Sequence, residues 1–250
     1  MRKFLLLFLW LLLPSLAAAD ALPMGSDLSG VLVYPWDATE MTATYVYRYA
    51  YPQVAGDDEV AQMINNTYAY EVSYAEEFTV PMTGDMLGSG RLQFQTLVSY
   101  DITCNNDEYF CVVLRSERME GAAFSTQLSA HTFARHGARA GRILSLPYLL
   151  GVLDADEEDP WLQERQTAKC DACVRDLIWE IIEEQRLLGE VAYYDDLTRE
   201  TFDMWFWPEE DFYLEQDGTL VFFIQEAAIA PQSEGILTFR FAPEEILDEL

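Results

Sequence analysis

The helical segment that begins at Asp159-Pro160 constrains the fold more than any other part of the sequence. Aspartate caps helix starts well and proline suits the first helical position, so this pair marks where the helix begins. Downstream, one face of the helix is apolar and the opposite face is charged. The apolar face carries Cys170, Cys173, Val174, Leu177, Ile178, Ile181 and Ile182. Such side chains contribute roughly 1.5–3 kcal/mol each when fully buried, so we expect this helix to pack on a β-sheet.

Two segments near the N-terminus are rich in strand-forming residues, Val31–Tyr34 and Met41–Tyr51. In the second, aromatic and other side chains alternate, which places one set of tyrosines on a single sheet face. These are Tyr45, Tyr47, Tyr49 and Tyr51. The pattern predicts a half-buried strand, and a carbohydrate platform is the alternative interpretation.

A helix is predicted after Asp57 and Asp58, where apolar residues recur at helical spacing over about five turns. The stretch Gly84–Gly90, with three glycines and a serine, predicts a flexible connection. It leads into a predicted strand, Leu92–Tyr100.

Residues 1–19 have the pattern of a secretory signal peptide. Arg2 and Lys3 precede the apolar run Phe4–Leu13, and Ala17–Ala19 supplies small residues for cleavage. A helix of ten residues is about 15 Å long, which is too short to cross a hydrocarbon layer of about 30 Å. We therefore expect export to the periplasm or the outside, without stable membrane insertion after cleavage. An uncleaved anchor is the alternative.

The charge of the chain excludes one class of partner. Acids outnumber bases 43 to 15, and the net charge is −28. Removal of residues 1–19 deletes two bases and no acids, which takes the charge to −30. Because a polyanion repels nucleic acids, no nucleic-acid partner is expected. We interpret the acidity as a solvated surface, with a cationic protein partner as the alternative.

Four cysteines in an exported chain predict two disulfides. They are Cys104, Cys111, Cys170 and Cys173. A hairpin folded about Asp107 and Glu108 places the first two directly opposite each other, which leaves the last two to pair. A redox Cys-x-x-Cys and a four-cysteine zinc site are alternatives, but the acidic, helix-prone stretch before Cys170 is not typical of a redox centre. No metal and no cofactor are expected.

The one local concentration of positive charge lies within Phe124–Ile143 and contains both histidines of the chain. The candidate binding residues there are His131, Arg135, His136, Arg139 and Arg142. Guanidinium groups form paired hydrogen bonds to carboxylates and phosphates, so an anion site is one interpretation. Ion pairs with the surplus acids are the other. Two histidines without a third ligand do not predict a metal site.

Trp205 and Trp207 are further candidate binding residues, because tryptophan rings stack on sugars. The carboxylates of Glu209, Glu210 and Asp211 follow them, and paired carboxylates divide the acid and base roles in glycan hydrolysis. A glycan or cell-wall hydrolase is therefore an alternative function, and a packing cluster of aromatic rings is the competing interpretation. Since the chain has no complete catalytic motif, we assign no catalytic residue.

The last third of the chain carries the motifs of a known family. They are Phe212-Tyr213-Leu214, the turn Asp217-Gly218, Leu220–Phe223, Ile229-Ala230-Pro231 and, after Gly235, Leu237–Phe241. This pattern resembles the C-terminal domain of the RsiV-type anti-sigma factors and of the peptidoglycan deacetylase PdaC, a bacterial family mostly of unknown function. Upstream, Tyr51–Val54 and the helix after it are similar to the small N-terminal module that accompanies this domain.

The resemblance spans residues 45–247 and has consequences for fold and function. With the signal peptide expected at 1–19, it implies an N-terminal PdaC-like α+β module at 20–122 and an RsiV-like α+β domain at 123–250. We expect antiparallel sheets packed by two main helices, in two intimately packed subdomains. It implies a non-catalytic module that binds or senses a cell-envelope partner, either a cationic protein such as the lysozyme sensed by RsiV-type proteins or a cell-wall glycan. Ala227 and Gln232 depart from the family pattern, which often has tyrosines there.

Overall fold

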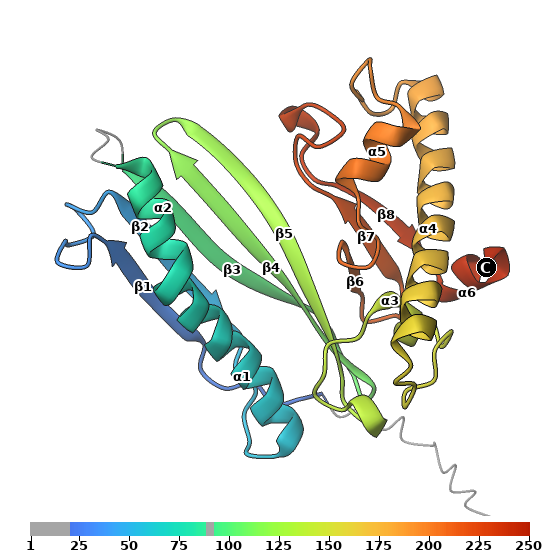
Figure 1. The fold of residues 1–250 in the computed structure, drawn as a ribbon, viewed down its shortest axis with the longest axis horizontal. Coiled ribbons are helices and arrows are strands. Elements are labelled where there is room, and N and C mark those ends of the chain that lie inside the picture. Colours follow the sequence, from blue (N-terminus) through green and yellow to red (C-terminus); the bar gives the residue numbers. More distant parts are fainter. Residues whose placement is uncertain (1–20, 89–92) are drawn as a thin grey trace, which may run out of the picture.

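Two β-sheets and the helices that cover them form a V with two arms in the computed structural model (Figure 1). The structure describes residues 21–88 and 93–250, so the predicted signal peptide lies outside the described residues. The first sheet has five strands in the order β1-β2-β3-β4-β5, and the second has three in the order β6-β7-β8. The α+β prediction is therefore confirmed.

The strands of the first sheet are β1 (Leu28–Tyr34), β2 (Tyr45–Tyr51), β3 (Phe94–Asn105), β4 (Tyr109–Glu120) and β5 (Ala123–Ala134). Those of the second are β6 (Phe212–Leu214), β7 (Leu220–Ile224) and β8 (Leu237–Phe241). The α-helices are α1 (Glu59–Tyr74), α2 (Val80–Leu87), α3 (Leu146–Leu149), α4 (Pro160–Leu188), α5 (Arg199–Trp205) and α6 (Pro243–Glu249). A π-helical turn, η1 (Ala75–Thr79), joins α1 to α2, and η2 (Gly137–Arg139) and η3 (Gln232–Glu234) are 3₁₀ turns.

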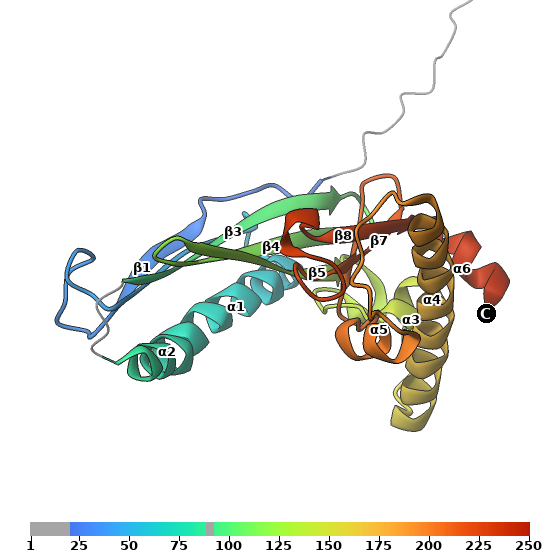
Figure 2. The ribbon, with the colours of Figure 1, turned by 90° about the horizontal axis from the view of Figure 1, so that it is seen from above.

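One strand pair differs from the expected antiparallel arrangement. β2 and β3 are parallel, with Tyr45 opposite Phe94 and Tyr49 opposite Val98. The reason is the connection between them: the helical segment α1-η1-α2 carries the chain back to the end of the sheet where β2 began. Figure 2 shows this segment lying along one face of the first sheet.

The first helix starts where the sequence predicts and ends later. The Asp58 side chain accepts a hydrogen bond from the Ala61 amide at 3.0 Å and so caps α1. The helix then continues through η1 and α2, so Gly84 is helical and not part of a flexible connection. Glycine is needed there because a Cβ would lie 2.1 Å from Cδ1 of Tyr34, whose ring packs against α2. The prediction of a flexible segment is wrong at Gly84, and residues 89–92 are not described.

The β3-β4 hairpin has the predicted register, with Cys104 directly opposite Cys111. The predicted disulfides are nevertheless absent, because all four cysteines are free thiols. The Cys111 sulfur instead accepts hydrogen bonds from the Thr132 hydroxyl at 3.1 Å and the Leu214 amide at 3.4 Å. Cys173 directs its thiol to the Ile246 carbonyl, 3.7 Å away. The sulfur atoms of Cys111 and Cys173 thus contact other groups of the protein.

The long helix α4 confirms the sequence prediction. Asp159 caps it by accepting a hydrogen bond from the Trp161 amide at 3.0 Å. Its buried side chains form one hydrophobic core with the second sheet and include Cys170, Val174, Ile178 and Ile182. The β6-β7 hairpin closes at Gly218, whose φ of 90° suits glycine.

A second hydrophobic core fills the space between the first sheet and α1, and β4 belongs to both cores. Phe110, Val112 and Leu114 point into the core beneath α1, whereas Cys111 points into the core of α4. The predicted domain boundary at 122/123 falls in the turn between the paired strands β4 and β5.

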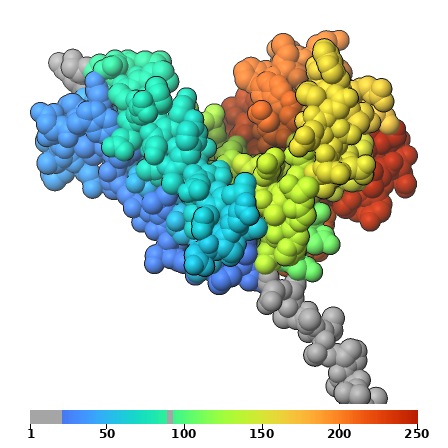
Figure 3. Space-filling view, turned by 60° about the horizontal axis from the view of Figure 1, so that its bottom comes forward, coloured from blue at the N-terminus to red at the C-terminus, as the bar shows by residue number. Residues whose placement is uncertain are grey.

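The outer edge of β5 faces the arm that contains the second sheet, and side chains from that arm cover this edge. Gln225 accepts a hydrogen bond from the Leu128 amide at 3.0 Å and donates one to the Leu128 carbonyl at 2.8 Å. Glu226 accepts from the Thr126 amide at 2.8 Å, and Gln232 donates to the Phe124 carbonyl. We call Gln225, Glu226 and Gln232 the edge clamp. The space-filling view shows a notch between the two arms (Figure 3).

Within residues 21–88 and 93–250, no helix is both long and apolar enough to cross a membrane.

Candidate ligand-binding groove

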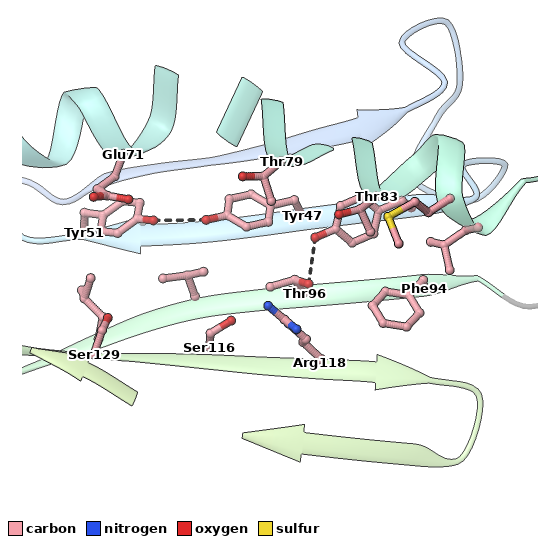
Figure 4. A pocket seen from close by; sticks show the side chains of 15 residues that line it. Tyr47, Tyr51, Glu71, Thr79, Thr83, Phe94, Thr96, Ser116, Arg118 and Ser129 are labelled. Carbon is pink, nitrogen blue, oxygen red and sulfur yellow. Dashed lines mark hydrogen bonds between the residues drawn. The ribbon is translucent and has the colours of Figure 1, made fainter. Parts of the chain in front are cut away.

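A groove with a volume of about 450 Å³ lies between the α1-η1-α2 segment and the first sheet (Figure 4). Its polar lining consists mainly of hydroxyl groups. These come from Tyr45, Tyr47, Tyr51, Thr79, Thr83, Thr96, Ser116 and Ser129. The apolar lining comes from Met86, Leu87, Phe94, Val98 and Leu114. Pockets of this volume, with apolar walls and a few directed polar groups, are typical of small-molecule sites.

Hydrogen bonds between side chains hold the tyrosines of the groove floor in place. The Tyr45 hydroxyl donates to the Thr96 hydroxyl at 2.9 Å, and the hydroxyls of Tyr47 and Tyr51 lie 3.1 Å apart. Burial raises the pKa of Tyr47 and Tyr51, so both phenols are neutral at ordinary pH. A neutral hydroxyl both donates and accepts, and the floor therefore offers hydrogen bonds of either sense.

Two charged side chains line the groove, Glu71 from α1 and Arg118 from β4. Figure 4 shows Glu71 beside Tyr51 and Arg118 beside Thr96, so the charges lie apart. Burial raises the pKa of Glu71. The positive charge of Arg118 partly opposes the rise that burial causes in the pKa of Tyr45. One charge of each sign leaves the groove close to neutral, in contrast to the chain as a whole.

The sequence explains part of this arrangement. Alternation along β2 directs its tyrosines toward the helix, as predicted for one sheet face, and three of them are buried. The contribution of the helix was missed. The helical segment directs three polar side chains toward the sheet, at spacings of eight and four residues: Glu71, Thr79 and Thr83. A helix face that only packs on a sheet is expected to be apolar. Polar residues on that face were the available signal.

The predicted cluster of arginines and histidines lies at the base of the V and is mostly engaged by protein groups. Arg135 donates to the Asn106 carbonyl. Arg139 donates to the Glu157 carbonyl at 3.0 Å, and its guanidinium lies 3.5 Å from the centre of the Tyr148 ring. His136 and Arg139 line the same cavity of about 280 Å³, which neither Trp205 nor Trp207 lines.

His131 and Arg142 do not join that cavity. Burial lowers the pKa of His131 to about 4, so its imidazole is neutral at pH 7, and its ring lies 5.9 Å from that of Tyr68. Arg142 is exposed.

Trp205 and Trp207 lie at and just after the end of α5, and both rings are about half exposed. Phe206 between them is fully buried in the α4 core. Of the carboxylates that follow, Asp211 accepts hydrogen bonds from the Trp207 amide at 3.0 Å and the Gln225 side chain at 3.4 Å. Glu209 and Glu210 line a separate cavity of about 280 Å³ beside β5. The structure thus gives Asp211 a structural role, and of the two glutamates Glu210 is exposed whereas Glu209 is half-buried.

No cluster of three or more histidine, cysteine or acidic side chains placed to hold a metal ion is found in the described ranges 21–88 and 93–250.

Two solved structures share the fold of this chain. One is a member of the DUF3298 family from Bacteroides fragilis NCTC 9343, with a TM-score of 0.53, 14% identity and coverage of 92% of this chain and 94% of that one. The other is a DUF3298 family protein from Pseudomonas aeruginosa PAO1, with a TM-score of 0.50, 15% identity and the same coverage of 92% and 94%. No family model and no curated protein matches the sequence. The structural neighbours therefore support the fold and name no function.

Proposed function

We propose that this protein is a non-catalytic binding module of the cell envelope and that its groove binds a cell-wall glycan. The observation that carries the proposal is the hydroxyl-rich lining. Sugars present hydroxyl groups that both donate and accept, and the groove offers eight side-chain hydroxyls that do the same. The apolar side chains between them suit the C–H faces of sugar rings.

The charge of the groove supports a ligand that is neutral overall. An anionic ligand would meet Glu71 and a cationic one would meet Arg118. The resemblance to PdaC-type proteins and the leader-like N-terminus agree with a glycan of the envelope.

The carboxylate count supports binding without turnover. Glycoside hydrolysis generally uses two carboxylates that flank the bond. Glu71 is the one carboxylate among the residues that line the groove. The hydrolase alternative would instead depend on Glu209 and Glu210, which line a different cavity.

Binding of soluble glycan tests the proposal. Titration calorimetry would use chitotetraose and soluble peptidoglycan strands with the purified protein. Ser116→Val removes a hydroxyl from the groove side of β4, and we expect it to weaken binding about tenfold. Ser99→Val is the matched control, because Ser99 neighbours Ser116's partner Val98 but lies on the opposite sheet face.

The same samples separate binding from hydrolysis through an assay for new reducing ends. Glycan binding that Ser116→Val weakens and Ser99→Val preserves, without new reducing ends, supports the proposal. Absence of binding, or equal binding by both variants, overturns it. Reducing ends that disappear in Glu209→Gln would establish the hydrolase instead.

A further inference from the structure

Five large apolar side chains are exposed in a row on the α1-η1-α2 segment. They are Tyr70, Tyr74, Phe78, Met82 and Met86, which we call the aromatic-methionine stripe. Each is between 47% and 82% exposed. The rings of Tyr70 and Tyr74 lie 6.2 Å apart, and those of Tyr74 and Phe78 lie 5.2 Å apart. Contiguous exposed apolar surface of this kind is typical of an interaction site.

The π-helical turn η1 keeps the stripe on one side of the helix. Residues four apart in an α-helix drift by about 40° per step, so five of them would spiral through about 160°. The extra residue that a π-turn inserts sets the helix back by about 100°, which offsets more than half of this drift. η1 covers Ala75–Thr79 and thus lies in the middle of the stripe. Such turns frequently accompany functional sites.

The stripe is open on its outer side. The side chains one position further along the helix, at residues 71, 79, 83 and 87, line the groove, whereas Tyr70, Tyr74, Phe78 and Met82 do not. Figures 1 and 2 show no other described element against the outer side of α1 and α2. Met86 belongs to both the stripe and the groove lining.

The charge around the stripe favours a basic partner. Residues 59–87 contain five acids, Glu59, Glu71, Glu76, Glu77 and Asp85, and no lysine, arginine or histidine. Glu76, Glu77 and Asp85 are exposed beside the stripe. A second copy of the chain would bring like charges together, and an anionic lipid surface would be repelled. A partner with basic groups around an apolar centre matches both properties.

We infer that the aromatic-methionine stripe docks a cationic amphipathic helix of another protein. Sixteen residues separate the ends of the stripe, or about 24 Å, which corresponds to between four and five turns of a partner helix. Apolar anchors at helical spacing fit such a surface, and methionine and aromatic side chains adapt to different partners. This surface is distinct from the groove floor, so a peptide and a glycan are separate ligands.

Peptide titration tests the inference. The probe is a leucine-lysine peptide of about 18 residues that forms an amphipathic helix, and its control is a scrambled peptide of equal composition. At about 0.15 M salt we expect the scrambled peptide to bind at least about tenfold more weakly. Tyr74→Ser, Phe78→Ser and Met82→Ser together should weaken binding of the helical peptide by about tenfold or more. These side chains are already exposed, so the fold does not depend on their burial, and thermal melting checks this.

Matched variants separate apolar docking from general attraction. Leu187→Ser with Leu188→Ser removes exposed apolar side chains at the end of α4 and should leave peptide affinity unchanged. Glu76→Gln with Glu77→Gln should weaken binding and reduce its salt dependence. Equal affinity for both peptides, or full affinity in the stripe variant, overturns the inference. If the parent protein instead forms a dimer or binds anionic vesicles, and the stripe variant loses that property, the inference is also overturned, because the stripe then binds a different partner. Glycan binding is measured separately and can fail or succeed independently.

Discussion

At the scale of single residues, the most perturbed carboxyl group is Asp171 on α4. Burial raises its pKa well above the ordinary value of 3.8, and the neighbouring Glu209 carboxyl raises it further, against a smaller effect of Arg175. Oδ1 of Asp171 and Oε2 of Glu209 are buried without hydrogen-bond partners among the described residues. A proton held on Asp171 allows the pair to remain buried together.

The raised pKa of Asp171 predicts how stability depends on pH. The protonated Asp171 contributes to the free energy of unfolding, and this contribution is fully present below pH 3.8, the pKa of the carboxyl in the unfolded chain. The contribution is lost as pH rises through the higher pKa of the folded protein, because the unfolded chain releases the proton at lower pH than the folded protein does. One proton changes stability by at most about 1.4 kcal/mol per pH unit. Asp171→Asn should therefore gain stability relative to the parent protein as pH rises from about 5 to 9.

Urea denaturation at several pH values measures this effect. Glu183→Gln, an exposed position on the same helix, is the control and should follow the parent protein. A parallel pH dependence in Asp171→Asn and the parent would show that Asp171 is ionised in the fold. The neutral His131 acts in the opposite direction, because its pKa is lowered to about 4 and it favours unfolding as pH falls below 6.5.

At the scale of elements, the edge clamp ties β5 to the second arm. The Gln225 amide makes both hydrogen bonds at Leu128 that a neighbouring strand residue would make. Gln225→Ala should destabilise the protein by about 1–2 kcal/mol and speed hydrogen exchange at the Leu128 amide. Gln225→Glu keeps the acceptor and loses the donor, so it should have an intermediate effect.

Hydrogen exchange followed by NMR, with urea denaturation, checks the clamp. Sedimentation adds a second readout, since an uncovered strand edge can pair with another chain. Gln232→Ala, at the exposed end of the clamp, should cost less than Gln225→Ala. If Leu128 exchanges equally slowly in Gln225→Ala and in the parent, the clamp does not protect this edge.

Local features of these elements were predictable from the sequence, whereas contacts between distant segments were not. The helix start at Asp57-Asp58, the cap Asp159 and the register of Cys104 opposite Cys111 follow from nearby residues, and all three are confirmed. The parallel pairing of β2 with β3 depends on the path of a connecting helix that local patterns do not specify. The disulfide prediction was wrong because a correct strand register does not fix where a sulfur atom points.

The candidate groove was harder to predict because its lining comes from the four strands β2 to β5 and from the α1-η1-α2 segment. Tyr45, Tyr47 and Tyr51 were recognised as one sheet face, but their partners Thr83 and Ser116 lie far along the chain. Gly84 was misread for a related reason. Its flexibility is suppressed by the ring of Tyr34, fifty residues earlier in the sequence.

At the scale of the whole molecule, a net charge of −28 acts against the compact state. Since salt screens this repulsion, we expect the melting temperature to rise by several degrees between about 0.02 and 0.5 M NaCl at pH 7. Scanning calorimetry measures the change. The rise should shrink toward pH 4.1, where the net charge approaches zero. A melting temperature that does not respond to salt at pH 7 would show that repulsion among the surface charges does not limit the stability of the fold.

The two faces of β4 serve different cores, since the neighbours Phe110 and Cys111 point in opposite directions. Inserting or deleting a single residue in the middle of this strand would exchange the faces of every residue on one side of the change. The change would place a phenyl ring where the structure has a thiol, and it would disrupt the packing of both cores at once. The centre of β4 must therefore keep its length for both cores to form.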